Sequence, residues 1–122
     1  MDAVVLQGKI DNLLRSAYRL LPAGSNTENL YADDFSLLNK NVHDLINELY
    51  SQKGRTIEQE ATLCLALLMG YSVSMYANPE DELKKQTVLL RTLKVLSLLP
   101  LSPLKEQLLS VYNGLQHSFE IN

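Results

Sequence analysis

Apolar side chains recur along most of the chain every three or four residues, the period of a helix with one buried face. Residues 2–21 carry the stripe Leu6, Ile10, Leu13, Leu14, Ala17 and Leu21, and residues 34–53 carry the stripe Phe35, Leu38, Val42, Leu45, Ile46 and Leu49. We expect Pro22 to end the first helix because proline lacks the amide donor. Gly54 is expected to cap the second.

The third apolar segment has a helix-start signal and no polar face. Thr56 with Gln59 forms a predicted capping box, and Glu58 suits the positive end of the helix dipole. From 61 to 69 the segment is apolar on nearly all sides, which predicts the central helix of the fold. Gly70 follows within the same helix, where glycine costs about 1 kcal/mol relative to alanine. Close packing against another helix is the expected reason.

Two further helices begin with a capping residue followed by proline, Asn78-Pro79 and Ser102-Pro103. The positions expected to face inward are Leu89, Leu90, Leu93 and Leu96 in the fourth helix, and Leu104, Leu108, Val111, Tyr112 and Leu115 in the fifth. No segment alternates as a strand does. The sequence therefore predicts an all-α fold, with residues 1–122 forming one domain, a five-helix antiparallel bundle of helical hairpins.

Two stretches leave room for other interpretations. The polar connection 22–32 is either a plain linker or a functional loop. The stretch between Glu60 and Glu80 has no charged residue and approaches the ~20 residues of a membrane span. It contains several polar and helix-breaking residues, so a buried helix explains it better. Because the N-terminus lacks a basic start and a long apolar run, no signal peptide is expected, and a cytoplasmic location fits.

Composition narrows the function classes. The 122 residues are 46% hydrophobic and carry a formal net charge of −3, which suits one globular domain and gives no reason to expect nucleic-acid binding. A cluster of cations is interpreted as a solvated face in preference to a nucleic-acid patch: Lys84, Lys85, Arg91 and Lys94. The single Cys64 excludes an intramolecular disulfide and fits a reducing compartment.

No constellation of residues points to catalysis, a metal or a cofactor. The two histidines, His43 and His117, cannot form a tight zinc site with one cysteine. Cys64 lies within the run LCLALL, whose burial should raise the thiol pKa and block access. The glycines are isolated and form no phosphate-binding loop. The expected function is therefore binding to another macromolecule.

Specific runs of sequence resemble the UpxZ family. They are Leu49-Tyr50-Ser51 with Lys53-Gly54 and Thr56, then residues 60–71 (EATLCLALLMGY), residues 94–100 (KVLSLLP), residues 102–105 (SPLK) and residues 107–109 (QLL). The resemblance covers about residues 35–114, and the run at 60–71 is its most specific part. These proteins are antagonists of transcription antitermination encoded in capsular-polysaccharide loci of Bacteroides.

The resemblance implies that the protein binds NusG-like antiterminators made by other capsule loci and inhibits them, without catalysis, cofactor or direct nucleic-acid contact. An inhibitor that spares its own antiterminator needs a recognition surface that differs between loci. The expected contact residues are exposed acids at helix starts, together with the 22–32 loop: Asp33, Asp34, Glu58, Glu60, Glu80 and Asp81. Simple dipole and capping chemistry is the alternative interpretation of these acids.

Two other functions stay open at this point. One is a small helical nucleic-acid-binding regulator, against which the mild acidity argues. The other is a dimerisation module. A NusG-like gene beside this one would favour the antagonist.

Overall fold

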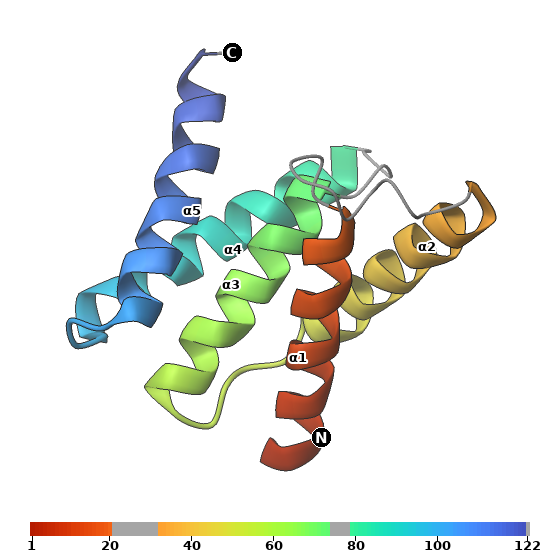
Figure 1. Cartoon of the computed structure of the whole chain (residues 1–122). Helices are drawn as coiled ribbons and strands as arrows, with labels where there is room; N and C mark the ends of the chain where they lie inside the picture. The colour runs from red at the N-terminus through yellow and green to blue at the C-terminus, as the bar shows by residue number, and fades with distance from the viewer. Residues whose placement is uncertain (21–31, 74–78, 122) are drawn as a thin grey trace.

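The computed structural model describes residues 1–20, 32–73 and 79–121, and the side chains of these residues apart from 32–35 and 116–121. Within these ranges the chain forms five helices and no strand (Figure 1), so the predicted all-α class is confirmed. The helices are α1 (Ala3–Leu20), α2 (Ala32–Leu49), α3 (Ile57–Val73), α4 (Pro79–Leu98) and α5 (Pro103–Ile121).

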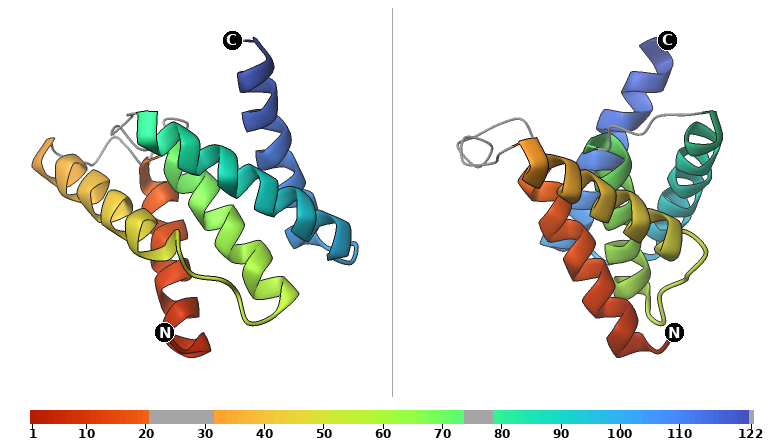
Figure 2. Two further views of the ribbon diagram at one scale, coloured as in Figure 1. Left: turned by 180° about the vertical axis from the view of Figure 1, so that it is seen from behind. Right: turned by 90° about the vertical axis from the view of Figure 1, so that its right-hand side faces the viewer.

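Helix α3 is the centre of the fold, as predicted. It packs against all four other helices, with α1 and α2 paired on one side and α4 and α5 paired on the other (Figures 1 and 2). Every residue from Leu63 to Gly70 is buried, because an apolar side chain on any face of α3 meets a neighbouring helix. Successive helices reverse direction in the two figures, but their axes are splayed, and the last turns of α5 extend beyond the other helices.

Local capping chemistry fixes three of the helix starts. The Asp2 carboxylate accepts a hydrogen bond from the Val5 amide at 2.8 Å. The Thr56 hydroxyl accepts one from the Gln59 amide at 3.0 Å, and the Ser102 hydroxyl accepts one from the Lys105 amide at 3.2 Å. The predicted caps at Thr56 and Ser102 are thus confirmed. The capping box at Thr56 is only half formed, because the Gln59 side chain accepts its hydrogen bond from the Arg55 amide, at 2.9 Å. Leu21, the Pro22 helix stop, residues 22–31 of the predicted loop and the Asn78 cap lie outside the described residues. Ala32, expected in that loop, is instead the first residue of α2.

The predicted end of the second helix is wrong. Helix α2 ends at Leu49, well before Lys53, and Gly54 does not cap it. Side chains from α3 and α4 hold residues 50–54 away from a helical path, as described below. A Cβ atom on Gly54 would lie 2.1 Å from the Glu60 amide nitrogen, so this position needs glycine for close approach of two backbone segments.

Helix α4 also differs from its predicted orientation. Leu90 and Leu93 were expected to face inward, but their side chains are 71% and 51% exposed. The buried residues of α4 are Val88, Leu89, Thr92, Val95 and Leu96. Among the described elements α4 packs only against α3 and α5, so it buries a narrower face than its leucine content suggests.

The prediction for Gly70 is confirmed. A Cβ atom there would lie 2.7 Å from Ile46 Cδ1 and 3.3 Å from Leu13 Cδ1, so α3 approaches α1 and α2 closely at this point. None of the described helices is long and apolar enough to cross a membrane. The uncharged stretch after Glu60 therefore behaves as a core helix through residue 73.

Candidate partner-binding surface

An ion pair joins the start of α3 to the middle of α4. Arg91 Nη2 lies 2.9 Å from Glu60 Oε2, and each side chain is only 18% exposed. The same guanidinium donates hydrogen bonds to the carbonyl oxygens of Tyr50, at 3.1 Å, and Gln52, at 2.9 Å. The Glu60 carboxylate also accepts a hydrogen bond from the Gly54 amide at 2.7 Å. The segment between α2 and α3 is therefore held against α4 by charge-assisted hydrogen bonds.

This network corrects two expectations. Arg91 was expected on a solvated face, and Glu60 was expected as an exposed contact residue. Each instead satisfies the other and the loop backbone in a largely covered site. A largely covered charge needs such partners, which is the physical reason why the two side chains are engaged with each other and with the loop.

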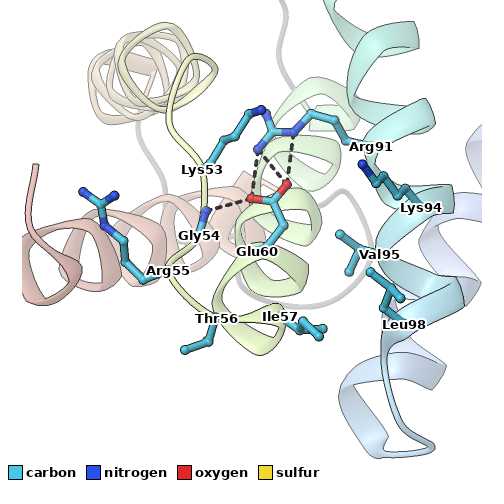
Figure 3. A pocket seen from close by; sticks show the side chains of 10 residues that line it. All are labelled: Lys53, Gly54, Arg55, Thr56, Ile57, Glu60, Arg91, Lys94, Val95 and Leu98. Atoms are coloured by element: carbon cyan, nitrogen blue, oxygen red, sulfur yellow. Dashed lines mark hydrogen bonds and ion pairs between the residues drawn. The ribbon is translucent and has the colours of Figure 1, made fainter.

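Beside the ion pair lies a hollow of about 520 Å³, shown in Figure 3. Its walls come from the segment before α3, from the first turns of α3 and from the second half of α4. The lining residues are Lys53, Gly54, Arg55, Thr56, Ile57, Glu60, Arg91, Lys94, Val95 and Leu98. Ile57, Val95 and Leu98 give it an apolar part, and the rest is polar or charged. We call this feature the α3–α4 hollow.

The cations at the α3–α4 hollow differ in how they are paired. Lys53 and Lys94 are exposed, and neither has a carboxylate within ion-pair distance among the described residues. Arg55 points away from the opening in Figure 3 and donates a hydrogen bond to the Met1 carbonyl. Four cationic side chains and one carboxylate line the hollow, in a chain whose net charge is −3. The surface is therefore locally positive on an acidic protein.

Exposed leucines continue from the hollow over the outer side of α4. Leu98 lines the hollow and is 59% exposed, and Leu90 lies two helical turns earlier on the same side. The other large apolar side chains exposed on α4 and the following turn are Leu83, Leu93 and Leu101. A run of exposed leucines next to charged residues is typical of a protein interaction surface.

Comparison with known proteins identifies the family. The model of the UpxZ family of transcription anti-terminator antagonists matches residues 10–114. The chain belongs to the UpxZ family. It is also similar to a crystal structure of a transcription anti-terminator antagonist UpxZ from Bacteroides uniformis ATCC 8492, with 39% sequence identity and a TM-score of 0.76. The match covers 88% of this chain and 66% of that one. No curated protein matches the sequence.

The acids predicted as contacts do not form one surface in this UpxZ-family fold. The starts of α2 and α4 lie toward one end of the molecule and the start of α3 toward the other (Figure 1). Glu58 is exposed on α3, whereas Glu80 is exposed on α4 and pairs with Lys84 at 3.4 Å. Asp81 is half-buried. Asp33 and Asp34 belong to the first turn of α2, but their side chains lie outside the described set.

Sequence reasoning missed the α3–α4 hollow because its two walls are far apart in the chain. Lys53 belongs to the segment before α3 and Lys94 to the penultimate turn of α4, and no local pattern links the two. The only local signal was the short polar run KGRT directly before an apolar helix. That run was interpreted as a helix end and a cap, which are its commoner roles.

Cys64 is fully buried, as predicted, and has no place in the candidate surface. Burial, followed by the nearby Glu60 carboxylate, raises the pKa of its thiol to about 11. A thiol that stays protonated at neutral pH is a poor nucleophile. Among the described residues, no group of three or more His, Cys, Asp or Glu side chains is placed to hold a metal ion.

Proposed function

We propose that this protein inhibits NusG-like transcription antiterminators by binding them, in the bacterial cytoplasm where transcription takes place. Its targets in this proposal are antiterminators from other capsular-polysaccharide loci, and its own locus is spared. The observation that carries the proposal is membership of a family of anti-terminator antagonists, matched over residues 10–114. The relative with 39% identity, which has the same description, supports it.

The surface of the molecule supports protein binding. Protein interfaces combine apolar contacts with a polar rim, and the exposed leucines of α4 beside Lys94 offer both. Nucleic-acid binding gains most of its affinity from phosphate neutralisation, which a chain of net charge −3 is poorly equipped to provide.

Exposed acids at the helix starts contribute to the choice of partner in this proposal. Glu58 and Glu80 are accessible, and they would repel antiterminators whose facing surface is acidic. The same role is proposed for three further acids because they lie at helix starts: Asp33, Asp34 and Asp81. Glu60 is withdrawn from the set because its carboxylate is occupied by Arg91 and the Gly54 amide.

The test is a readthrough reporter in cells that co-express the protein with one antiterminator at a time. Antiterminators from several other loci, and the one from its own locus, are compared. We expect inhibition of one or more of the non-cognate proteins and little or none of the cognate one. A Leu67→Asp variant, which places a charge in the core, serves as the inactive control. Inhibition of none, or of all equally, would contradict the proposal.

A further inference from the structure

We propose that the α3–α4 hollow binds an acidic segment of the antiterminator that inserts an apolar side chain between its carboxylates. This inference rests on the proposed function and specifies the recognition site. Apart from Glu60, which lines the hollow, it locates partner binding on residues other than the acids at the helix starts.

The positive charge of the hollow favours a negatively charged ligand. Lys53 and Lys94 come from opposite walls, and neither is paired with a carboxylate among the described residues. Elsewhere Lys9, Lys40, Lys84 and Lys85 are paired with carboxylates of this chain, whereas Lys105 is not among the ion pairs of the described residues. Two like charges that share one opening are relieved when a ligand brings carboxylates between them.

The apolar part of the hollow favours a partner segment that has an apolar side chain in addition to its carboxylates. Ile57 is 42% exposed and Leu98 is 59% exposed, although both lie beside a recess that could cover them. An apolar side chain of the partner would remove part of this surface from water, and that burial favours binding. A volume of about 520 Å³ lies in the range of sites that hold a few side chains.

The shape of the hollow is set before the partner arrives. Arg91 holds the carbonyl groups of Tyr50 and Gln52, and Glu60 holds the Gly54 amide. Lys53 and Arg55 flank Gly54, so the wall that carries Lys53 is fixed at its base. Binding to a preformed site avoids the entropy loss of ordering a loop.

A nucleic-acid strand fits the hollow less well. Proteins that bind a backbone neutralise several phosphates and add stacking aromatic side chains. Here two unpaired lysines flank aliphatic residues, and none of the described residues that line the hollow is aromatic. An acidic peptide with an aliphatic residue matches both features.

The experiment measures binding of the full chain to purified, fluorescently labelled NusG-like antiterminators from other capsule loci. The double variant Lys53→Glu/Lys94→Glu should raise the Kd by about tenfold or more, because a paired charge becomes a repelled one. Leu98→Ser should raise the Kd without changing the charge. The matched control, Arg15→Glu/Arg19→Glu, makes the same charge change on exposed residues of α1, which lines no part of the hollow. It should bind nearly as the wild type does.

Circular dichroism checks that each variant keeps its helix content, and a salt titration separates charge from packing. Wild-type binding should weaken as salt rises, and that dependence should be smaller for the Lys53→Glu/Lys94→Glu protein. If the wild type binds an antiterminator and this variant binds it equally well, the inference is wrong while the proposed function stands. If the wild type binds none of them, both fail. Tight binding of an RNA or DNA oligonucleotide that the double variant abolishes would also overturn the inference.

Discussion

Helices α3 and α4 are both rich in leucine, yet they have opposite surroundings. In α3, Leu63, Leu67 and Leu68 are fully buried. In α4, Leu83 and Leu90 are 65% and 71% exposed. The difference follows from position, because α3 has neighbours on every side while α4 packs only against α3 and α5 among the described elements.

This contrast separates two roles for apolar residues in a small protein. Leucines surrounded by protein stabilise the fold, and leucines left in water beside unpaired lysines are available to a partner. The Glu60–Arg91 ion pair joins the two regions, since it connects the start of α3 to α4 and to the intervening loop. Substitutions should therefore affect stability in one region and binding in the other.

The largest expected contrast is between two leucine truncations. Leu67→Ala should lower the free energy of unfolding by about 3–5 kcal/mol, because it opens a cavity in a fully buried site. Leu90→Ala should change it by no more than about 0.5 kcal/mol. Urea denaturation followed by circular dichroism measures both. Similar losses for the two variants would mean that the outer side of α4 is covered in solution.

The next largest effect is expected for the Glu60–Arg91 ion pair, which connects the two regions. Arg91→Met should cost about 3 kcal/mol of stability, because it leaves Glu60 and two loop carbonyls without their donor in a mostly buried site. The control is Lys40→Met, which removes an exposed ion pair with Asp44 and should cost at most about 0.5 kcal/mol. Equal, small losses in thermal or urea unfolding would show that the ion pair does not hold the loop.

A pH titration of stability tests the burial of Cys64. Its folded pKa is about 11, raised from 9.0, so between these values the unfolded chain loses the proton while the folded chain keeps it. Stability should therefore be complete below pH 9 and fall above it, by on the order of 2 kcal/mol near pH 10.5. Cys64→Ala should lose this part of the decline. An unchanged alkaline profile in Cys64→Ala would argue against a buried thiol.

The smallest expected effect tests the close contact at Gly70. In Gly70→Ala the added methyl meets Ile46, a crowding that outweighs the better helix propensity of alanine, for a net loss of about 1 kcal/mol. Ile46→Val removes the nearest atom, so the double variant should be more stable than the sum of the single changes predicts. Strict additivity in urea unfolding would place the two residues out of contact.

Prediction from the sequence succeeded where the signal was local or where a helix was apolar on nearly all sides. The caps at Thr56 and Ser102 depend on neighbouring residues alone, and every residue from 61 to 69 except Thr62 is buried, whichever way it faces. It failed for Leu90 and Leu93, because α4 has leucines on more than one side and the sequence does not say which side is covered. The helical period alone does not show which of these leucine-bearing faces is buried.

The α3–α4 hollow could not be predicted for a related reason. It depends on the approach of Lys53 and Lys94, and on the pairing of Arg91 with Glu60 across 31 residues of sequence. Pairing between distant charges is a property of the tertiary structure. Without it, Arg91 resembles the other cations of α4 and Glu60 resembles an ordinary acid at a helix start.

The most direct test of the central claim, that the partner covers the α3–α4 hollow, is a thiol-protection measurement. In a Cys64→Ala background, Leu98→Cys places a reactive group at the hollow, and Leu37→Cys places one at a similarly exposed position on α2. Each protein is labelled with a thiol reagent with and without a non-cognate antiterminator. We predict that the antiterminator slows labelling of Leu98→Cys in proportion to the bound fraction and leaves Leu37→Cys unchanged. Protection of Leu37→Cys with free labelling of Leu98→Cys would contradict the account.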